Sequence, residues 1–260
     1  MADYILIRKG RNILSSILHL VFNLVLGIGS IFLTIITGSW TLGVVLVFLS
    51  KWRMFAVRPR YWWLNLKSNL VDLIVGISLI LITYCSGTSL LPIHFILAAA
   101  YALWLILIKP RSGEIDTEAQ ALIAVFLGTT AATLMSANAN ASFLVISAFI
   151  IGYGASRHIL AQSEEHDFTL TTLVAGLLAA EIAWLCHSWL IVYIFAGTGI
   201  IIPQLAIFLT LITFVFNQIY KSLFKHDGKL KLIDIAMPTV FTLLIITIII
   251  LWFSKPIFDV

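Results

Sequence analysis

The sequence is dominated by long apolar runs that are separated by short segments rich in lysine and arginine. A helix needs about 20 predominantly apolar residues to cross roughly 30 Å of hydrocarbon, and several of these runs reach that length. Only 11% of the 260 residues are charged, 61% are apolar, and the mean hydropathy is +1.06. This composition requires a lipid solvent, and the lack of short alternating segments favours helices over a barrel. The sequence therefore predicts an all-α, polytopic integral membrane helical bundle.

The basic segments and the turns between them divide the chain into about nine spans within a single transmembrane domain, residues 1–260. We expect helical hairpins at 13–50, 69–108, 118–156 and 168–220, followed by a final span at 235–253. Turns rich in glycine and polar residues, at 37–40, 86–88, 137–140 and 196–199, split each hairpin into two helices. The basic and aromatic segment 51–67 is typical of a chain that lies along lipid headgroups. Similar basic loops recur along the sequence. A repeated helical hairpin would produce this pattern, and so would any chain that crosses the membrane at regular intervals.

The positive charges lie almost entirely on one side of the membrane in this scheme. Fifteen of the sixteen lysine and arginine residues fall on that side, and Lys255 alone falls on the other. Because cytoplasmic loops carry such an excess, we expect a plasma membrane protein with a cytoplasmic N-terminus and an external C-terminus. The net charge of +4 then reflects topology, so the expected partner is the lipid bilayer and not nucleic acid. The expected topology charges, which also touch anionic headgroups, are Arg58, Arg60, Lys109 and Arg111.

Glu181 is the clearest candidate for a functional group, because it lies about halfway along a predicted span. An ionisable side chain in hydrocarbon needs a partner, water or a proton, since keeping it charged there costs several kcal/mol. Thr172, Gly176, Ala180 and Ala183 form a stripe of small residues suited to close helix packing, and Glu181 points away from it. We expect Glu181 to face a second helix or a cavity, as a proton or cation site or as a protonated structural group. His187, six residues on, could extend a polar path.

Two further spans carry polar stripes at helical spacing. The first contains His19 and Asn23, one turn apart, which could bind a partner, a proton or the Glu181 carboxylate, although interhelical packing explains them as well. The eighth contains a row that ends at Asn217, in which the threonine hydroxyls could bond their own backbone four residues back. The candidate polar path is therefore formed by Glu181, His19, Asn23, His187 and Asn217.

Asp72 and Asp234 each fall in the first turn of a predicted span. We expect them to cap the helix or to pair with nearby lysine or arginine. Cys85 and Cys186 lack metal-ligand spacing and are expected to be two packed thiols and not a disulfide. No role is assigned to His94 or His166. We expect no metal or cofactor, because no phosphate loop, nucleophile elbow, zinc-protease helix or haem-attachment motif occurs.

These features favour a small transporter or permease with Glu181 in its polar path, without naming a substrate. The main alternative is a non-catalytic anchor or scaffold subunit of a larger complex, which suits the minimal loops. An integral membrane enzyme that modifies lipids is the third reading, with the basic loops as headgroup binders. Homo-oligomers and partner membrane subunits are both compatible with the sequence.

Overall fold

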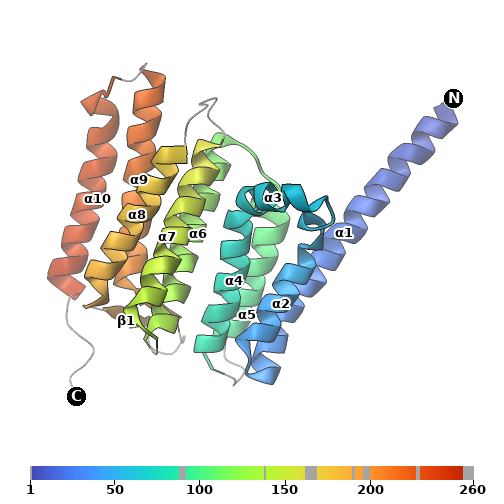
Figure 1. The fold of residues 1–260 in the computed structure, drawn as a ribbon, viewed down its shortest axis with the longest axis horizontal. Helices are drawn as coiled ribbons and strands as arrows, with labels where there is room; N and C mark the ends of the chain where they lie inside the picture. Colours follow the sequence, from blue (N-terminus) through green and yellow to red (C-terminus); the bar gives the residue numbers. More distant parts are fainter. Residues whose placement is uncertain are drawn as a thin grey trace.

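The structure, a computed structural model, describes residues 2–87, 92–137, 139–161, 169–188, 191–195, 200–226 and 229–253. The elements are α1 (Ala2–Thr37), α2 (Trp40–Ser50), η1 (Trp52–Met54), η2 (Pro59–Tyr61), α3 (Trp62–Ser68), α4 (Leu70–Cys85), α5 (Pro92–Leu103), the π-helix η3 (Trp104–Ile108), α6 (Glu114–Ser136), α7 (Ala141–Leu160), α8 (Thr169–His187), β1 (Val192–Phe195), β2 (Ile200–Pro203), α9 (Gln204–Lys225) and α10 (Leu232–Phe253). The long helices run roughly parallel, with α1 and α2 at one end of the row and α8, α9 and α10 at the other (Figure 1). Helix α2, the helix formed by α5 and η3, and α9 end at the top of the bundle in Figure 1. We call this the basic end, because Lys51 and Lys109 follow the first two helices and Lys225 ends α9.

The helices confirm the predicted class, a helical membrane protein, but not the number of spans. Among the described residues, α6, α7, α8, α9 and α10 are long and apolar enough to cross a membrane. The segment Pro59–Ser68 and α4 make a sixth span if they are counted together, although they meet at a bend of 70°. Apolar helices at Val21–Thr37, Trp40–Ser50 and Pro92–Ile108 are shorter. At a rise of about 1.5 Å per residue, the 11 residues of α2 are too few to cross the hydrocarbon alone.

Helix α6 lies at the centre of the bundle and packs against α4, α7 and α9. Small residues allow this close approach: a Cβ on Gly128 would lie 2.9 Å from Ile74 of α4 and 3.0 Å from Ile151 of α7. The stripe of small residues predicted on α8 is confirmed, because all four of its members are buried. Its Gly176 lies against Phe149 of α7, and a Cβ on this glycine would lie 3.0 Å from the Phe149 carbonyl oxygen. Close packing of small residues therefore holds α6 against α4 and α7, and α8 against α7.

Two of the predicted hairpin turns are confirmed by their glycines. Gly38, between α1 and α2, has φ 61°, and Gly87, which follows α4, has φ 96°. Such left-handed conformations strain residues that carry a Cβ, so glycine can reverse the chain here at little energetic cost. Both cysteines are unpaired thiols, as expected.

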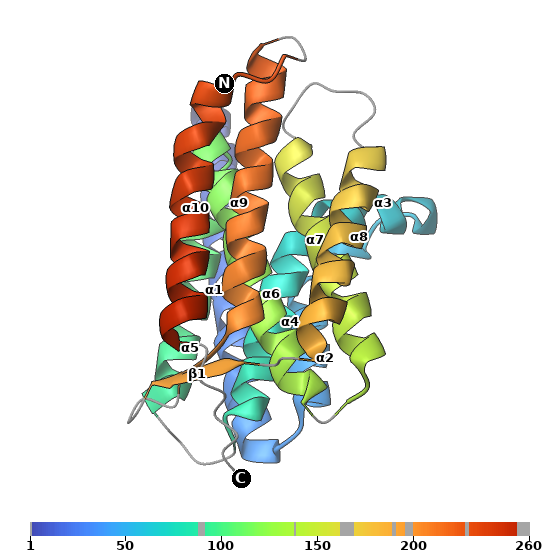
Figure 2. The ribbon, with the colours of Figure 1, turned by 90° about the vertical axis from the view of Figure 1, so that its left-hand side faces the viewer.

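The structure corrects several local expectations. The chain between α8 and α9 is not simply a break between two helices, because β1 and β2 pair as an antiparallel hairpin at the end opposite the basic end (Figures 1 and 2). The predicted turn at 196–199 lies outside the described residues. Helix α1 begins at Ala2 and α6 at Glu114, both earlier than the apolar runs indicate, because hydrogen-bonded helix continues through polar residues. His94, to which no role was assigned, is 1% exposed, and His166 lies outside the described residues.

Candidate functional site

The structure does not bring the predicted polar path together. Glu181 is exposed on α8, beside exposed Leu177, Leu178, Trp184 and Leu185. Its side chain is exposed, so the described part of the chain does not cover it with the expected neighbour. His187, at the end of the same helix, is half-buried, and its Nδ1 has no partner within the described part.

The polar residues of α1 lie far from α8. Asn23 is half-buried on α1, and α1 lies at the opposite end of the row of helices from α8 (Figure 1). His19 lies on the same helix, but its side chain is outside the described residues. The bundle therefore separates α1 from α8, and a path that joins His19 and Asn23 to Glu181 within one chain has no geometric support.

Asn217 is the candidate that does line a cavity. The cavity has a volume of about 710 Å³ and lies at the basic end between α6, α9 and α10, with one wall from α7. Its lining is Glu114, Thr117, Glu118, Ile159, Asn217, Gln218, Tyr220, Lys221, Ser222, Phe224, Lys225 and Asp234. Cavities of roughly 300–1,000 Å³ with a few convergent polar groups are typical of sites for small molecules.

An ion-paired cluster occupies the wall between α6 and α9. The Nζ of Lys221 lies 2.7 Å from Oε2 of Glu118 and 3.1 Å from Oε1 of Glu114. Gln218 donates from Nε2 to the other oxygen of Glu118 at 3.0 Å. The Glu118 side chain is only 12% exposed, whereas that of Glu114 is 73% exposed. Both acids lie one turn apart near the N-terminus of α6, and Lys221 lies near the C-terminus of α9, so each charge complements its helix dipole.

Asn217 lies one turn deeper than Lys221 on α9 and is 1% exposed. Neither its Oδ1 nor its Nδ2 has a hydrogen-bond partner in the described part of the chain. The threonines of the same polar row, Thr210 and Thr213, instead donate to the carbonyls of Ala206 and Leu209, four residues back, as the backbone alternative predicted. Asn217 is therefore the member of this row with unused hydrogen-bonding capacity.

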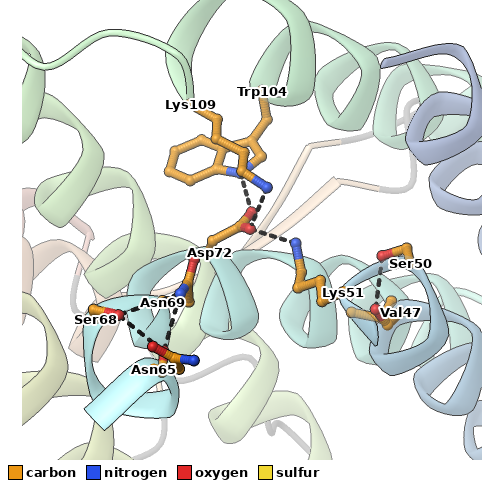
Figure 3. Close-up of polar contacts among 9 residues, drawn as sticks. All are labelled: Val47, Ser50, Lys51, Asn65, Ser68, Asn69, Asp72, Trp104 and Lys109. Carbon is orange, nitrogen blue, oxygen red and sulfur yellow. Dashed lines mark hydrogen bonds and ion pairs between the residues drawn. The ribbon is translucent and has the colours of Figure 1, made fainter. Parts of the chain in front are cut away.

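A second polar cluster lies at the basic end, around Asp72 of α4 (Figure 3). Asp72 is 7% exposed, and its Oδ2 lies 2.5 Å from Nζ of Lys51 and 2.6 Å from Nζ of Lys109. The indole of Trp104, in the π-helix, donates to Oδ1 at 3.0 Å. This confirms the predicted pairing of Asp72 with nearby lysine. Burial lowers the pKa of Lys51, and the attraction of Asp72 opposes that shift.

The backbone carbonyls beside the π-helix have their own partner on α6. Gln120 donates from Nε2 to the carbonyl of Ile108 at 2.7 Å and to that of Arg111 at 2.8 Å. Its Oε1 lies 2.8 Å from Nε2 of His158 on α7. This network fixes the chain that connects η3 to α6, and the Asp72 carboxylate beside it is already held by Lys51, Lys109 and Trp104. We therefore interpret the Asp72 cluster as structural, because it holds the ends of α2 and η3 against α4.

The predicted headgroup residues lie apart from both clusters, except for Lys109. Arg58 and Arg60 lie in an exposed segment with exposed Tyr61 and Trp62, and the Arg60 guanidinium stacks on the Tyr61 ring at 4.6 Å. This segment and α3 project sideways from the bundle near the basic end (Figure 2). Arg111 lies 3.5 Å from Asp116 of α6.

Sequence reasoning missed Glu114, Glu118 and Gln218 as site residues and treated Lys221 as a topology charge. The helical spacing of Glu114 and Glu118, four residues apart, was the available signal for a shared face. The sequence does not show that α6 and α9, about a hundred residues apart, pack against each other.

Comparison with protein-family models, with curated proteins and with solved structures finds no match to this chain. The fold and the apolar helices define the class, a polytopic helical membrane protein.

Proposed function

We propose that this protein is a small transporter or permease and that a polar solute binds in the cavity between α6, α9 and α10. The observation that carries the proposal is Asn217, whose amide is buried at the cavity without a partner in the described chain. An amide buried without hydrogen bonds destabilises a protein by about 1–3 kcal/mol. Both amide atoms are covered in this structure, so a solute would remove that penalty by displacing the atoms above them, donating to the oxygen and accepting from the nitrogen.

The proposed path differs from the one that the sequence favoured. Its centre is the cluster of Glu118, Lys221 and Asn217 on α6 and α9, and Glu181 lies outside it. Charged and amide side chains facing one another within apolar helices mark solute pathways in membrane proteins. The volume of the cavity falls in the range that is typical of solute sites, and its position at one end of the bundle is suitable for the entrance of a path.

Uptake into proteoliposomes tests this proposal. The full chain is reconstituted, and uptake of radiolabelled methylammonium, glycine, glycerol and acetate is compared with that of protein-free liposomes. We expect uptake of at least one solute by the wild type and a reduction of about tenfold in Asn217→Leu, equivalent to one lost hydrogen bond of ~1.4 kcal/mol. Asn217→Leu removes an unpaired amide, so its unfolding midpoint is expected to stay at or above that of the wild type.

Glu181→Gln is the matched variant outside the cavity, and we expect it to take up solute as the wild type does. A wild-type protein that takes up none of the four solutes above the protein-free rate would overturn the proposal. A loss of uptake in Glu181→Gln with full uptake in Asn217→Leu would show that the solute passes along α8 and not through the cavity.

A second candidate function, an anchor or scaffold subunit, is favoured by the exposed position of Glu181. A carboxyl group on an apolar outer surface is unfavourable in lipid, and a partner helix that hydrogen bonds to it would relieve this. Purification in mild detergent discriminates the two functions. A stoichiometric partner chain that is retained by the wild type and lost from Glu181→Lys supports the scaffold, whereas a lone chain in both samples excludes it.

A further inference from the structure

The charged groups that line the cavity are unequal in number. Glu114, Glu118 and Asp234 supply three carboxylates, whereas Lys221 and Lys225 supply two ammonium groups, so the lining carries a formal charge of −1. Asp234 has separate partners, because His226 lies 2.9 Å from its Oδ2 and the positive charge of Lys225 lies near its carboxylate. The unbalanced charge therefore lies at the inner cluster, where Glu114 and Glu118 share the single ammonium of Lys221.

The inner cluster is better suited to a cation than to an anion. Lys221 already faces two carboxylates, so an approaching anion would meet two negative charges for each positive one. Glu118 is 12% exposed, and water screens its charge less than it screens the charge of Glu114. A carboxylate has about four lone-pair sites, and Glu118 uses only one on each oxygen, toward Lys221 and Gln218.

Asn217 adds an acceptor for the same cation. It lies four residues before Lys221, which places it about 6 Å deeper along α9, and its Oδ1 is unpaired within the described chain. A primary ammonium group has three N–H donors. One donor can bind to a free lone pair of Glu118, and the others remain for the Asn217 amide oxygen once the atoms that cover this oxygen are displaced.

The size and the remaining lining point to an organic cation. A volume of about 710 Å³ is much larger than a bare inorganic ion requires. Ile159 and Phe224 supply apolar wall on which a short carbon chain can pack. We infer that the cavity selects a small organic amine in its ammonium form over neutral and anionic solutes of the same shape. This inference deepens the proposed function and rests on the use of the same cavity as a solute site.

Binding to the purified full chain in detergent tests this selectivity. n-Butylamine hydrochloride, n-butanol and sodium butyrate are titrated at equal ionic strength and fixed pH, and the thermal unfolding midpoint is followed. We expect a saturable rise with butylamine and no saturable rise with the other two probes. A shift of equal size and affinity with butanol or butyrate overturns the inference.

Three variants locate the amine. Glu118→Gln keeps an acceptor for Gln218 but loses the charge, and we expect butylamine affinity to fall about tenfold or more. Asp116→Asn removes a carboxylate from the same helix outside the cavity and should bind as the wild type does. Lys225→Gln removes a positive charge from the lining and should strengthen amine binding about two- to fivefold, a change of opposite sign that a folding defect would not produce. Unchanged affinity in Glu118→Gln, or weaker binding in Lys225→Gln, overturns the inference.

Binding and uptake together separate the two proposals. Selective butylamine binding without uptake of any solute would sink the transport function and leave the ammonium site standing. Uptake of acetate or glycerol in preference to methylammonium, with no butylamine binding, would sink the ammonium site and leave transport standing.

Discussion

The Asp72 cluster predicts a large and specific loss of stability when one charge is removed. Asp72→Asn keeps an oxygen that can accept from the Trp104 indole, so the substitution isolates the carboxylate charge. It leaves Lys51, which is 7% exposed, without a counter-charge. Removing one partner of a buried ion pair destabilises proteins by about 3–5 kcal/mol, because the other charge stays buried and unpaired. We expect a loss of this size in the free energy of unfolding.

Two further variants test the origin of that loss. Lys51→Met combined with Asp72→Asn removes the stranded charge and should recover about 2 kcal/mol relative to Asp72→Asn alone. Lys109→Met should destabilise by under about 1 kcal/mol, because the Lys109 side chain is 35% exposed and reaches water. Titration of the protein from dodecyl maltoside micelles with sodium dodecyl sulfate, followed by circular dichroism, gives these free energies. A double variant that is as unstable as Asp72→Asn would refute the reasoning.

The pH dependence gives an independent check. Burial lowers the pKa of Lys51 below its ordinary value of 10.5, and removing Asp72 takes away the attraction that opposes this shift. In the variant, the pKa of Lys51 in the folded chain therefore lies further below its value in the unfolded chain. Between these two values the unfolded chain binds a proton at Lys51 and the folded chain does not, so stability rises with pH across a wider range. The deficit of Asp72→Asn relative to the wild type should therefore narrow as the pH rises from about 7 toward 10. A deficit that stays constant or widens would contradict this account of Lys51.

Three other outcomes follow from the packing and the topology. Gly43→Ala should destabilise the protein by about 1–3 kcal/mol, since a Cβ there would collide with Thr34 Oγ1 and lie 2.7 Å from Ile80. A Cβ at Gly29 meets nothing within 4 Å, so Gly29→Ala should be neutral or stabilising. The same detergent titration compares the two variants, and equal losses of stability would refute the packing argument. Gln120→Leu should cost about 1–3 kcal/mol because two backbone carbonyls lose their donor, and an unchanged midpoint would show that water replaces it. Tags at the two chain ends should be reachable from opposite faces of the membrane, with the N-terminus on the cytoplasmic face, and labelling of both from the same face would exclude an odd number of spans.

Much of the fold could be predicted because the position of a membrane helix depends on the composition of its own segment of the sequence. The apolar runs predicted α6 to α10, the glycines at 38 and 87 end helices as expected, and the small stripe of α8 packs as its spacing indicated. The β-hairpin before α9 could not be anticipated in this way. Strands of four residues leave too short a pattern to distinguish from the end of an apolar helix.

The candidate site could be predicted only in part. Asn217 was expected in a polar path and lines the cavity, but the path was built around Glu181, which lies exposed on α8. A position in mid-span marks a residue as unusual without saying which neighbour it faces. Glu118 and Lys221 instead resembled ordinary charges at the ends of spans.

The sequence by itself determined that this chain forms apolar helices in a membrane, because the cost of exposing apolar surface and unpaired backbone depends on composition along each segment. Only the tertiary structure decided which polar side chains meet. Lys51 reaches Asp72 across 21 positions of the chain, and Lys221 reaches Glu118 across 103. Such pairs form when separate helices pack against each other, and that packing depends on contacts which no single segment encodes.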